Sequence, residues 1–231
     1  MEKKIIANSN EITQPGQQKY SLALQIPAQL FSYIFHPLFI PVMAACYLAY
    51  VHQGYFTGIT PHNKLFIIIK VIENTVILPG ATVLLFKAVG FIKSIFFKTQ
   101  RERIFVYVAA NFFYFWMYLV FRSQAEVPSI LTAFIFGIFL SSSVGLFANI
   151  YFKISMHALG MGALCGLLLL IIFSGSSYNV FLAAMLVFLI TGLVSSSRLV
   201  VSDHHPFDIY TGIILGIICQ FISAAFIGLS T

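Results

Sequence analysis

The feature that most constrains this chain is a series of long apolar runs, each close to the ~20 residues that an α-helix needs to cross a lipid bilayer. The runs are, in order, Leu30–Val51, Leu65–Leu85 or as far as Ile92, Ile104–Phe121, Ser129–Tyr151, His157–Phe173, Val180–Ser196 and Ile209–Leu229. Hydrophobic residues make up 59% of the chain and charged residues 9%, which excludes a soluble globule, whose apolar share is about half. In lipid, backbone polar groups must be satisfied within the protein, so the runs predict helices.

The runs predict an all-α fold, a polytopic membrane helix bundle with six to seven transmembrane helices. The count stays open because the fifth and sixth runs are short. The second run is interrupted by Lys70, Glu73, Asn74 and Pro79. Residues 1–28 form a polar N-terminal leader without the apolar core and cleavage site of a signal peptide, so we expect it to remain on the mature protein. Residues 29–231 are then a single transmembrane domain.

Small residues inside the runs indicate close helix packing. They recur at helical spacing in two sets: Ala158, Gly162 and Gly166, and Gly212 and Gly216. Such spacing lets helix backbones approach each other in lipid. The three cysteines also fall inside apolar runs, at spacings typical of neither a metal site nor a disulfide framework, so we interpret them as small apolar residues.

The ionisable residues gather in three clusters. The first holds Lys93, Lys98, Arg101 and Arg103. The second holds Lys153, Ser155 and His157. The third holds Arg198, Asp203, His204, His205 and Asp208. An even number of predicted crossings separates each pair of clusters, so all three are expected on one membrane face, where they can build one site.

A phosphate group is the anion that best explains this concentration of cations. An isolated Arg or Lys in the bilayer costs at least ~2.5 kcal/mol, so several together are unfavourable without a compensating anion. Arg offers forked donors to phosphate oxygens, and Lys offers a point charge. The alternative is a set of interfacial anchors that obey the positive-inside rule.

The histidines add chemistry that anchoring does not need. His204 and Asp208 are four residues apart and share a helix face if this segment winds into the last run. A carboxylate bonded to one ring nitrogen fixes the tautomer and leaves the other nitrogen as a nucleophile or base. Pro206 suits a first helical turn, because no N–H is needed there. His157 is then a second imidazole, which can protonate a leaving oxygen.

These residues resemble the motifs of the type 2 phosphatidic acid phosphatases, membrane lipid phosphatases related to the vanadium haloperoxidases. The third family motif is matched in full, by Ser197, Arg198, His204 and Asp208, and "HP" and "IYTG" resemble its usual surroundings. The second motif is matched in part by Ser155 and His157, with Met156 where the family has Gly. In the first motif, Arg103 takes the Arg position, Ile104 replaces Pro, and Lys98 lies two residues closer to Arg103 than the family's Lys does. "FHPLF" and "KIS-x-H" are similar to a divergent membrane branch.

The resemblance implies a role for each matched residue. His204 attacks phosphorus to give a phosphohistidine, Asp208 orients it, and His157 protonates the leaving group and later activates water. The implied phosphate-binding residues are Lys98, Arg103, Lys153, Ser155 and Arg198. The family needs no metal or other cofactor. His205 stands at an aromatic position of the motif, so packing or substrate contact is its expected role.

The expected substrate is a lipid phosphate or diphosphate, of the phosphatidic acid, phosphatidylglycerol phosphate, polyprenyl diphosphate or lipid A type. The expected partners are membrane lipids, with no nucleic acid, in the inner (plasma) membrane of a bacterium. The side of the membrane on which the site lies stays open. The excess of Lys and Arg on the face that holds the site indicates the cytoplasm, since only Lys64 and Arg122 lie clearly on the opposite face. The resemblance implies the other side, because the family's usual site faces away from the cytoplasm.

Three other interpretations remain. One is a catalytically degraded relative of the family. Another is a metalloenzyme with a zinc or iron cage built from His157, His204, His205, Asp203 and Asp208, although the neighbouring cations would repel a metal ion. The last is a transporter or binding protein without chemistry, in which Lys70 and Glu73 form an ion-coupling pair. A buried pair three residues apart, joined by Asn74, explains these two more simply.

Overall fold

A computed structural model describes residues 20–92, 100–175, 180–201 and 204–229. Its described part contains six helices long and apolar enough to cross a membrane. They are Pro61–Ala88 (α3, Pro61–Ile72, with α4, Leu78–Ala88), α5 (Gln100–Arg122), α6 (Ser129–Tyr151), α7 (Met156–Phe173), α8 (Phe181–Val201) and α9 (Pro206–Ile227). The prediction of an all-α polytopic membrane bundle is confirmed.

The first predicted span is not one helix. The continuous helix expected over Leu30–Val51 is wrong: α1 (Leu22–Ile34) ends early, and a second helix runs over Ile40–Val51 as α2 (Ile40–Cys46) and a π-helical turn. Pro37 is the physical reason, because it lacks an N–H and disfavours helical backbone at the preceding residue, His36. The 13 residues of α1 reach only about 20 Å, so this half is too short to cross a bilayer alone. The helix also begins inside the segment expected to be a polar leader.

The second span is continuous but contains a π-helical turn over Glu73–Ile77. Pro79 follows this turn and has no N–H to donate to the preceding turn, which favours a local change of hydrogen-bond register. The expected pair between Lys70 and Glu73 is wrong. Lys70 Nζ donates instead to Gln124 Oε1 at 2.9 Å, and Glu73 is exposed.

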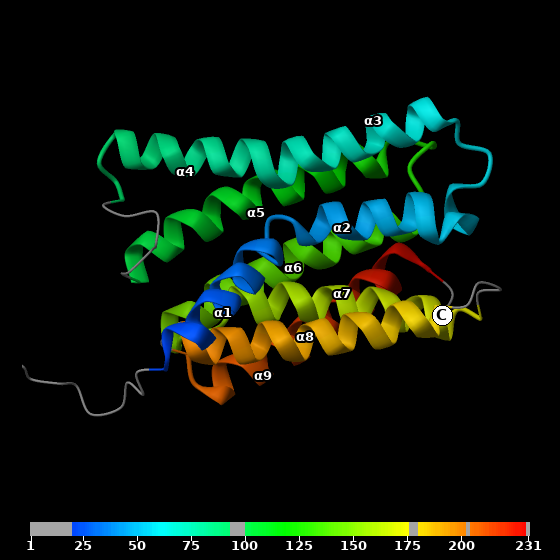
Figure 1. Cartoon of the computed structure of the whole chain (residues 1–231). Coiled ribbons are helices and arrows are strands. Elements are labelled where there is room, and N and C mark those ends of the chain that lie inside the picture. Colours follow the sequence, from blue (N-terminus) through cyan, green and yellow to red (C-terminus); the bar gives the residue numbers. More distant parts are fainter. Residues whose placement is uncertain (1–19, 93–99, 176–179, 202–203, 230–231) are drawn as a thin grey trace, which may run out of the picture.

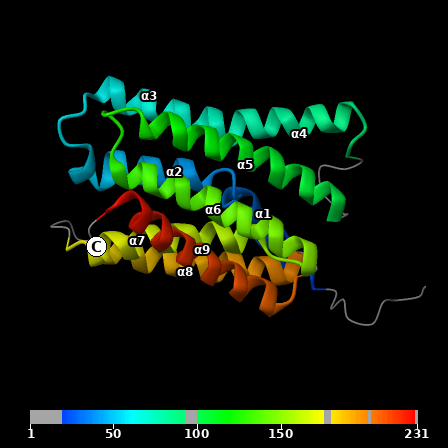
Figure 2. The same ribbon diagram turned by 180° about the vertical axis from the view of Figure 1, so that it is seen from behind.

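The helices are arranged in layers. Figures 1 and 2 show α3, α4 and α5 along one side of the bundle and α8 and α9 along the other, with α2, α6 and α7 between them. A Cβ at Gly162 would collide with the backbone of Ile213, and one at Gly216 with the Leu159 carbonyl. The predicted packing role of these glycines on α7 and α9 is therefore confirmed.

Polar side chains fasten α9 to α6 inside the bundle. Ser223 Oγ donates to the Ala133 carbonyl at 2.5 Å, and Gln220 Nε2 donates to the Phe134 carbonyl at 3.3 Å. Both side chains are fully buried. Bonds of this kind contribute about 0.6 kcal/mol each in a membrane protein. Together with the glycine contacts, they hold α9 against α6 and α7.

Candidate functional site

The site lies where the first turns of α7 and α9 meet the last turn of α8. Ser155 N–H donates to the Asp208 carbonyl at 3.3 Å, which joins the starts of α7 and α9. Arg198 lies in the last turn of α8. The described members of the second and third clusters therefore lie at one end of the bundle, as the count of crossings predicted. Lys98 and Asp203 lie outside the described residues.

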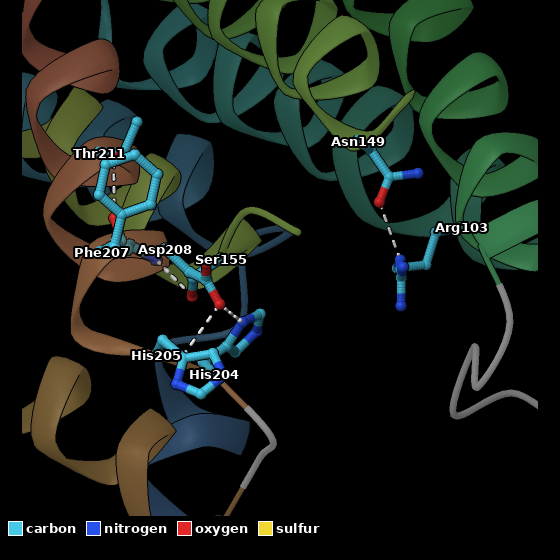
Figure 3. Close-up of polar contacts among 9 residues, drawn as sticks. Arg103, Asn149, Ser155, His204, His205, Phe207, Asp208 and Thr211 are labelled. Carbon is cyan, nitrogen blue, oxygen red and sulfur yellow. Dashed lines mark hydrogen bonds and ion pairs between the residues drawn. The ribbon is translucent and has the colours of Figure 1, made fainter. Parts of the chain in front are cut away.

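His204 and Asp208 form a close pair. His204 Nδ1 is 3.3 Å from Asp208 Oδ2, and the same oxygen accepts the His205 N–H at 3.0 Å (Figure 3). Asp208 is the third residue of α9 and is 6% exposed. The pair does not lie on one helix face, because α9 begins only at Pro206 and His204 precedes it. The turn before the helix folds the imidazole back onto the carboxylate.

The surroundings of His204 keep its imidazole neutral. Burial lowers the pKa of His204 to about 4, helped by the positive charges of Lys153 and Arg198 and opposed by the bond to Asp208. A carboxylate accepts hydrogen bonds only, so Nδ1 carries the proton and Nε2 the lone pair. His204 therefore presents an unprotonated Nε2 at neutral pH.

The broken first span contributes residues that the sequence analysis missed. His157 Nε2 lies 3.0 Å from the Ser32 carbonyl, and Arg198 Nη1 donates to Ser32 Oγ at 3.3 Å. The rings of His36 and His157 meet edge to face, with centroids 5.4 Å apart. The "FHPLF" stretch contains His36 but was used only for the family resemblance, and no sequence signal marks Ser32.

Ser155 has a structural role in the described site. It is the N-cap of α7, is fully buried, and its Oγ accepts the Ala158 N–H at 3.4 Å. Met156 follows at the first helical position, where a backbone N–H has no acceptor inside the helix. The positive ends of the α7 and α9 dipoles thus both face this region, which favours an anion.

Arg103 is not brought to the histidines. Arg103 Nε donates to Asn149 Oδ1 at 2.9 Å, and Figure 3 shows this pair apart from His204 and Asp208. Asn149 is buried near the end of α6, and no motif marked it in the sequence. The predicted first and third motifs are therefore on the same face of the bundle without direct contact between Arg103 and the His204 pair.

The described cluster suits an anion better than a cation. Arg198 and Lys153 supply positive charge beside one carboxylate, Asp208. Within the described ranges, no group of three or more His, Cys, Asp or Glu side chains is placed to hold a metal ion. A neutral imidazole, a second imidazole and two cations are groups that can carry out phosphoryl transfer.

Comparison with known proteins adds no family assignment. The chain matches no protein-family model, and no curated protein or solved structure matches it. The likeness to the type 2 phosphatidic acid phosphatases therefore rests on the motif residues alone.

Proposed function

We propose that this chain is a membrane phosphatase, a divergent relative of the type 2 phosphatidic acid phosphatases, which hydrolyses a lipid phosphate through a phosphohistidine on His204. The observation that carries this proposal is the His204–Asp208 pair, 3.3 Å between Nδ1 and Oδ2, in the positive field of Arg198 and Lys153. A transporter or binding site for an anion needs the cations but has no use for an oriented, neutral nucleophile.

The first chemical step transfers the phosphoryl group to the protein. His204 Nε2 attacks phosphorus, the bond from phosphorus to the leaving oxygen breaks, and that oxygen takes a proton from His157. The negative charge of the bound phosphate stabilises this proton on His157 beforehand, against the effect of burial and the positive charge of Arg198. Arg198 and Lys153 offset the charge that develops on the phosphoryl oxygens.

The second step releases phosphate. Water attacks the phosphohistidine, His157 accepts the proton of the water, and the bond between phosphorus and Nε2 breaks. Asp208 holds the Nδ1 proton through both steps, so the same tautomer is restored. No group outside the chain, the substrate and water is required to balance these steps.

The position of the site in an apolar bundle supports a lipid as the substrate. The outward face of α1, beside α8, is apolar and exposed, as at Leu22, Ile26 and Tyr33. A lipid whose phosphate enters the site can keep its tail among such side chains and the bilayer. The proposal takes the protein to act in the plasma membrane of a bacterium on a lipid phosphate or diphosphate.

Trapping of the phosphoenzyme tests the proposal. Purified full-length protein is mixed with radiolabelled lipid phosphates of the four types and quenched in alkaline detergent, because phosphohistidine is acid-labile. We expect wild type to release phosphate and to carry label, and His204→Ala to do neither. His205→Ala is the matched control: its side chain is exposed beside the same helix start, and we expect substantial activity.

Two outcomes contradict the proposal. Label trapped on His204→Ala but absent from His205→Ala would mean that the motif is displaced by one residue. If folded wild type releases no phosphate from any of these lipids, the proposed enzymatic function is wrong. Size-exclusion profiles and thermal unfolding establish that each variant is folded.

A further inference from the structure

The break between α1 and α2 leaves backbone carbonyls without helical partners, among them that of Ser32. In a continuous helix the Ser32 carbonyl would accept the N–H of His36, four residues on. Pro37 disfavours helical backbone at His36, and the last helical bond of α1 runs from the Phe35 N–H to the Phe31 carbonyl, so the next carbonyl, that of Ser32, has no helical partner. A free carbonyl inside an apolar bundle is unfavourable without another donor.

His157 is the donor that the structure supplies. Its Nε2 lies 3.0 Å from the Ser32 oxygen, across 125 positions of the chain. A carbonyl oxygen accepts hydrogen bonds and never donates, so Nε2 must carry the proton. In the neutral ring the lone pair is then on Nδ1.

The same short segment contacts the site at further points. Ser32 Oγ accepts a hydrogen bond from Arg198 at 3.3 Å, and the His36 ring meets His157 edge to face. Gly160, one turn along α7, has no side chain, and a Cβ built there would lie 3.7 Å from Pro37. The break therefore packs directly on the first turn of α7, where His157 lies.

We propose that the α1–α2 break is a positioning element of the active site, in which the Ser32 carbonyl holds His157 as the Nε2–H tautomer. His157 Nδ1 is then the atom that gives a proton to the leaving oxygen and takes one from water. The role parallels that of Asp208, which holds His204 through the opposite ring nitrogen. This inference rests on the proposed phosphatase function.

Removing Pro37 tests the positioning role by kinetics. In Pro37→Ala the helix can continue, and the His36 N–H competes with His157 for the Ser32 carbonyl. We expect kcat to fall at least about tenfold with KM within about threefold, because general acid–base catalysis contributes about 10²–10⁴ and the phosphate contacts are retained. Pro27→Ala is the matched control. Pro27 lies inside α1 with an exposed side chain, and we expect its kcat to equal that of wild type.

A second measurement does not depend on activity. Nitrogen-15 chemical shifts of histidine-labelled protein report the tautomer of each ring, and the resonances lost in His157→Gln identify His157. We expect a protonated Nε2 on His157 in wild type and in Pro27→Ala, and a mixture of tautomers in Pro37→Ala. If Pro37→Ala does not fold, the spectrum of wild type is sufficient to test the tautomer. A proton on His157 Nδ1 and none on Nε2 would overturn the inference.

The two hypotheses fail in distinguishable ways. A folded wild type that hydrolyses none of the lipids overturns the proposed function, whatever the tautomer. A wild type that hydrolyses a lipid, together with a folded Pro37→Ala of unchanged kcat, overturns the positioning role and leaves the phosphatase function standing.

Discussion

Replacing Asp208 with Asn probes the chemistry of the site with almost no change of shape. The carboxylate oxygen Oδ2 accepts from His204 Nδ1 and from the His205 N–H. Because both donors share one oxygen, an Asn side chain that keeps its oxygen there retains both bonds without the negative charge, and one that turns its NH₂ group there loses both. Where that NH₂ faces the imidazole, it favours the tautomer with the proton on Nε2, which removes the lone pair that attacks phosphorus.

The expected loss is large in rate and small in stability. Loss of the correct tautomer at the orienting carboxylate of a catalytic triad lowers kcat by about 10⁴-fold. The separation of 3.3 Å is longer than the ~2.8 Å of a strong charge-assisted bond, so we expect about 10²–10³. Weakening one charged bond and losing a carboxylate at a helix start lowers the free energy of unfolding by only about 1–2 kcal/mol.

The assay compares phosphate release, in single turnover and at steady state, with thermal unfolding of the same preparations. Glu126→Gln is the matched control, since the Glu126 carboxylate binds Asn63 Nδ2 at 3.0 Å and the same chemical change is expected to leave kcat unaltered. The reasoning is refuted if folded Asp208→Asn turns over within about threefold of wild type, because His204 then needs no carboxylate to hold its tautomer.

Three further results are expected. Arg198→Lys keeps the charge but loses the forked donor, so phosphate-release kinetics should show a loss of tenfold or more in kcat/KM, and near-normal kinetics would make Arg198 an interfacial anchor. EDTA should leave turnover unchanged; loss restored by zinc would favour the metal-cage interpretation. The free energy of unfolding should fall by up to about 3 kcal/mol as the pH drops from 6.5 to 4, because the folded pKa of His204 lies below its unfolded value of 6.5, so the unfolded chain binds the proton first. Denaturant titrations of wild type and His204→Gln test this, and equal slopes against pH would contradict it.

Local sequence spacing predicted the parts of the site that lie close together along the chain. His204, Asp208 and the helix start at Pro206 fall within five residues, so turn and helix geometry alone bring them together. The crossing count predicted that Lys153 and Arg198 would share their face, and both charges act on His204. Spacing could not predict that Arg103 would bind Asn149, because that contact depends on the relative rotation of α5 and α6.

The first span shows why hydropathy alone could not predict the contacts of His157 with Ser32 and His36. The mean hydropathy of Leu30–Val51 predicts burial in lipid, but hydropathy does not distinguish a continuous helix from two halves. Non-helical backbone at membrane depth is tolerated only where protein or water satisfies its polar groups. Pro37 indicates where the helix breaks. A hydrogen-bond donor must therefore lie near the carbonyl that loses its helical partner at the break. The sequence contains that donor, His157, yet only the packing of α7 against the break identifies it.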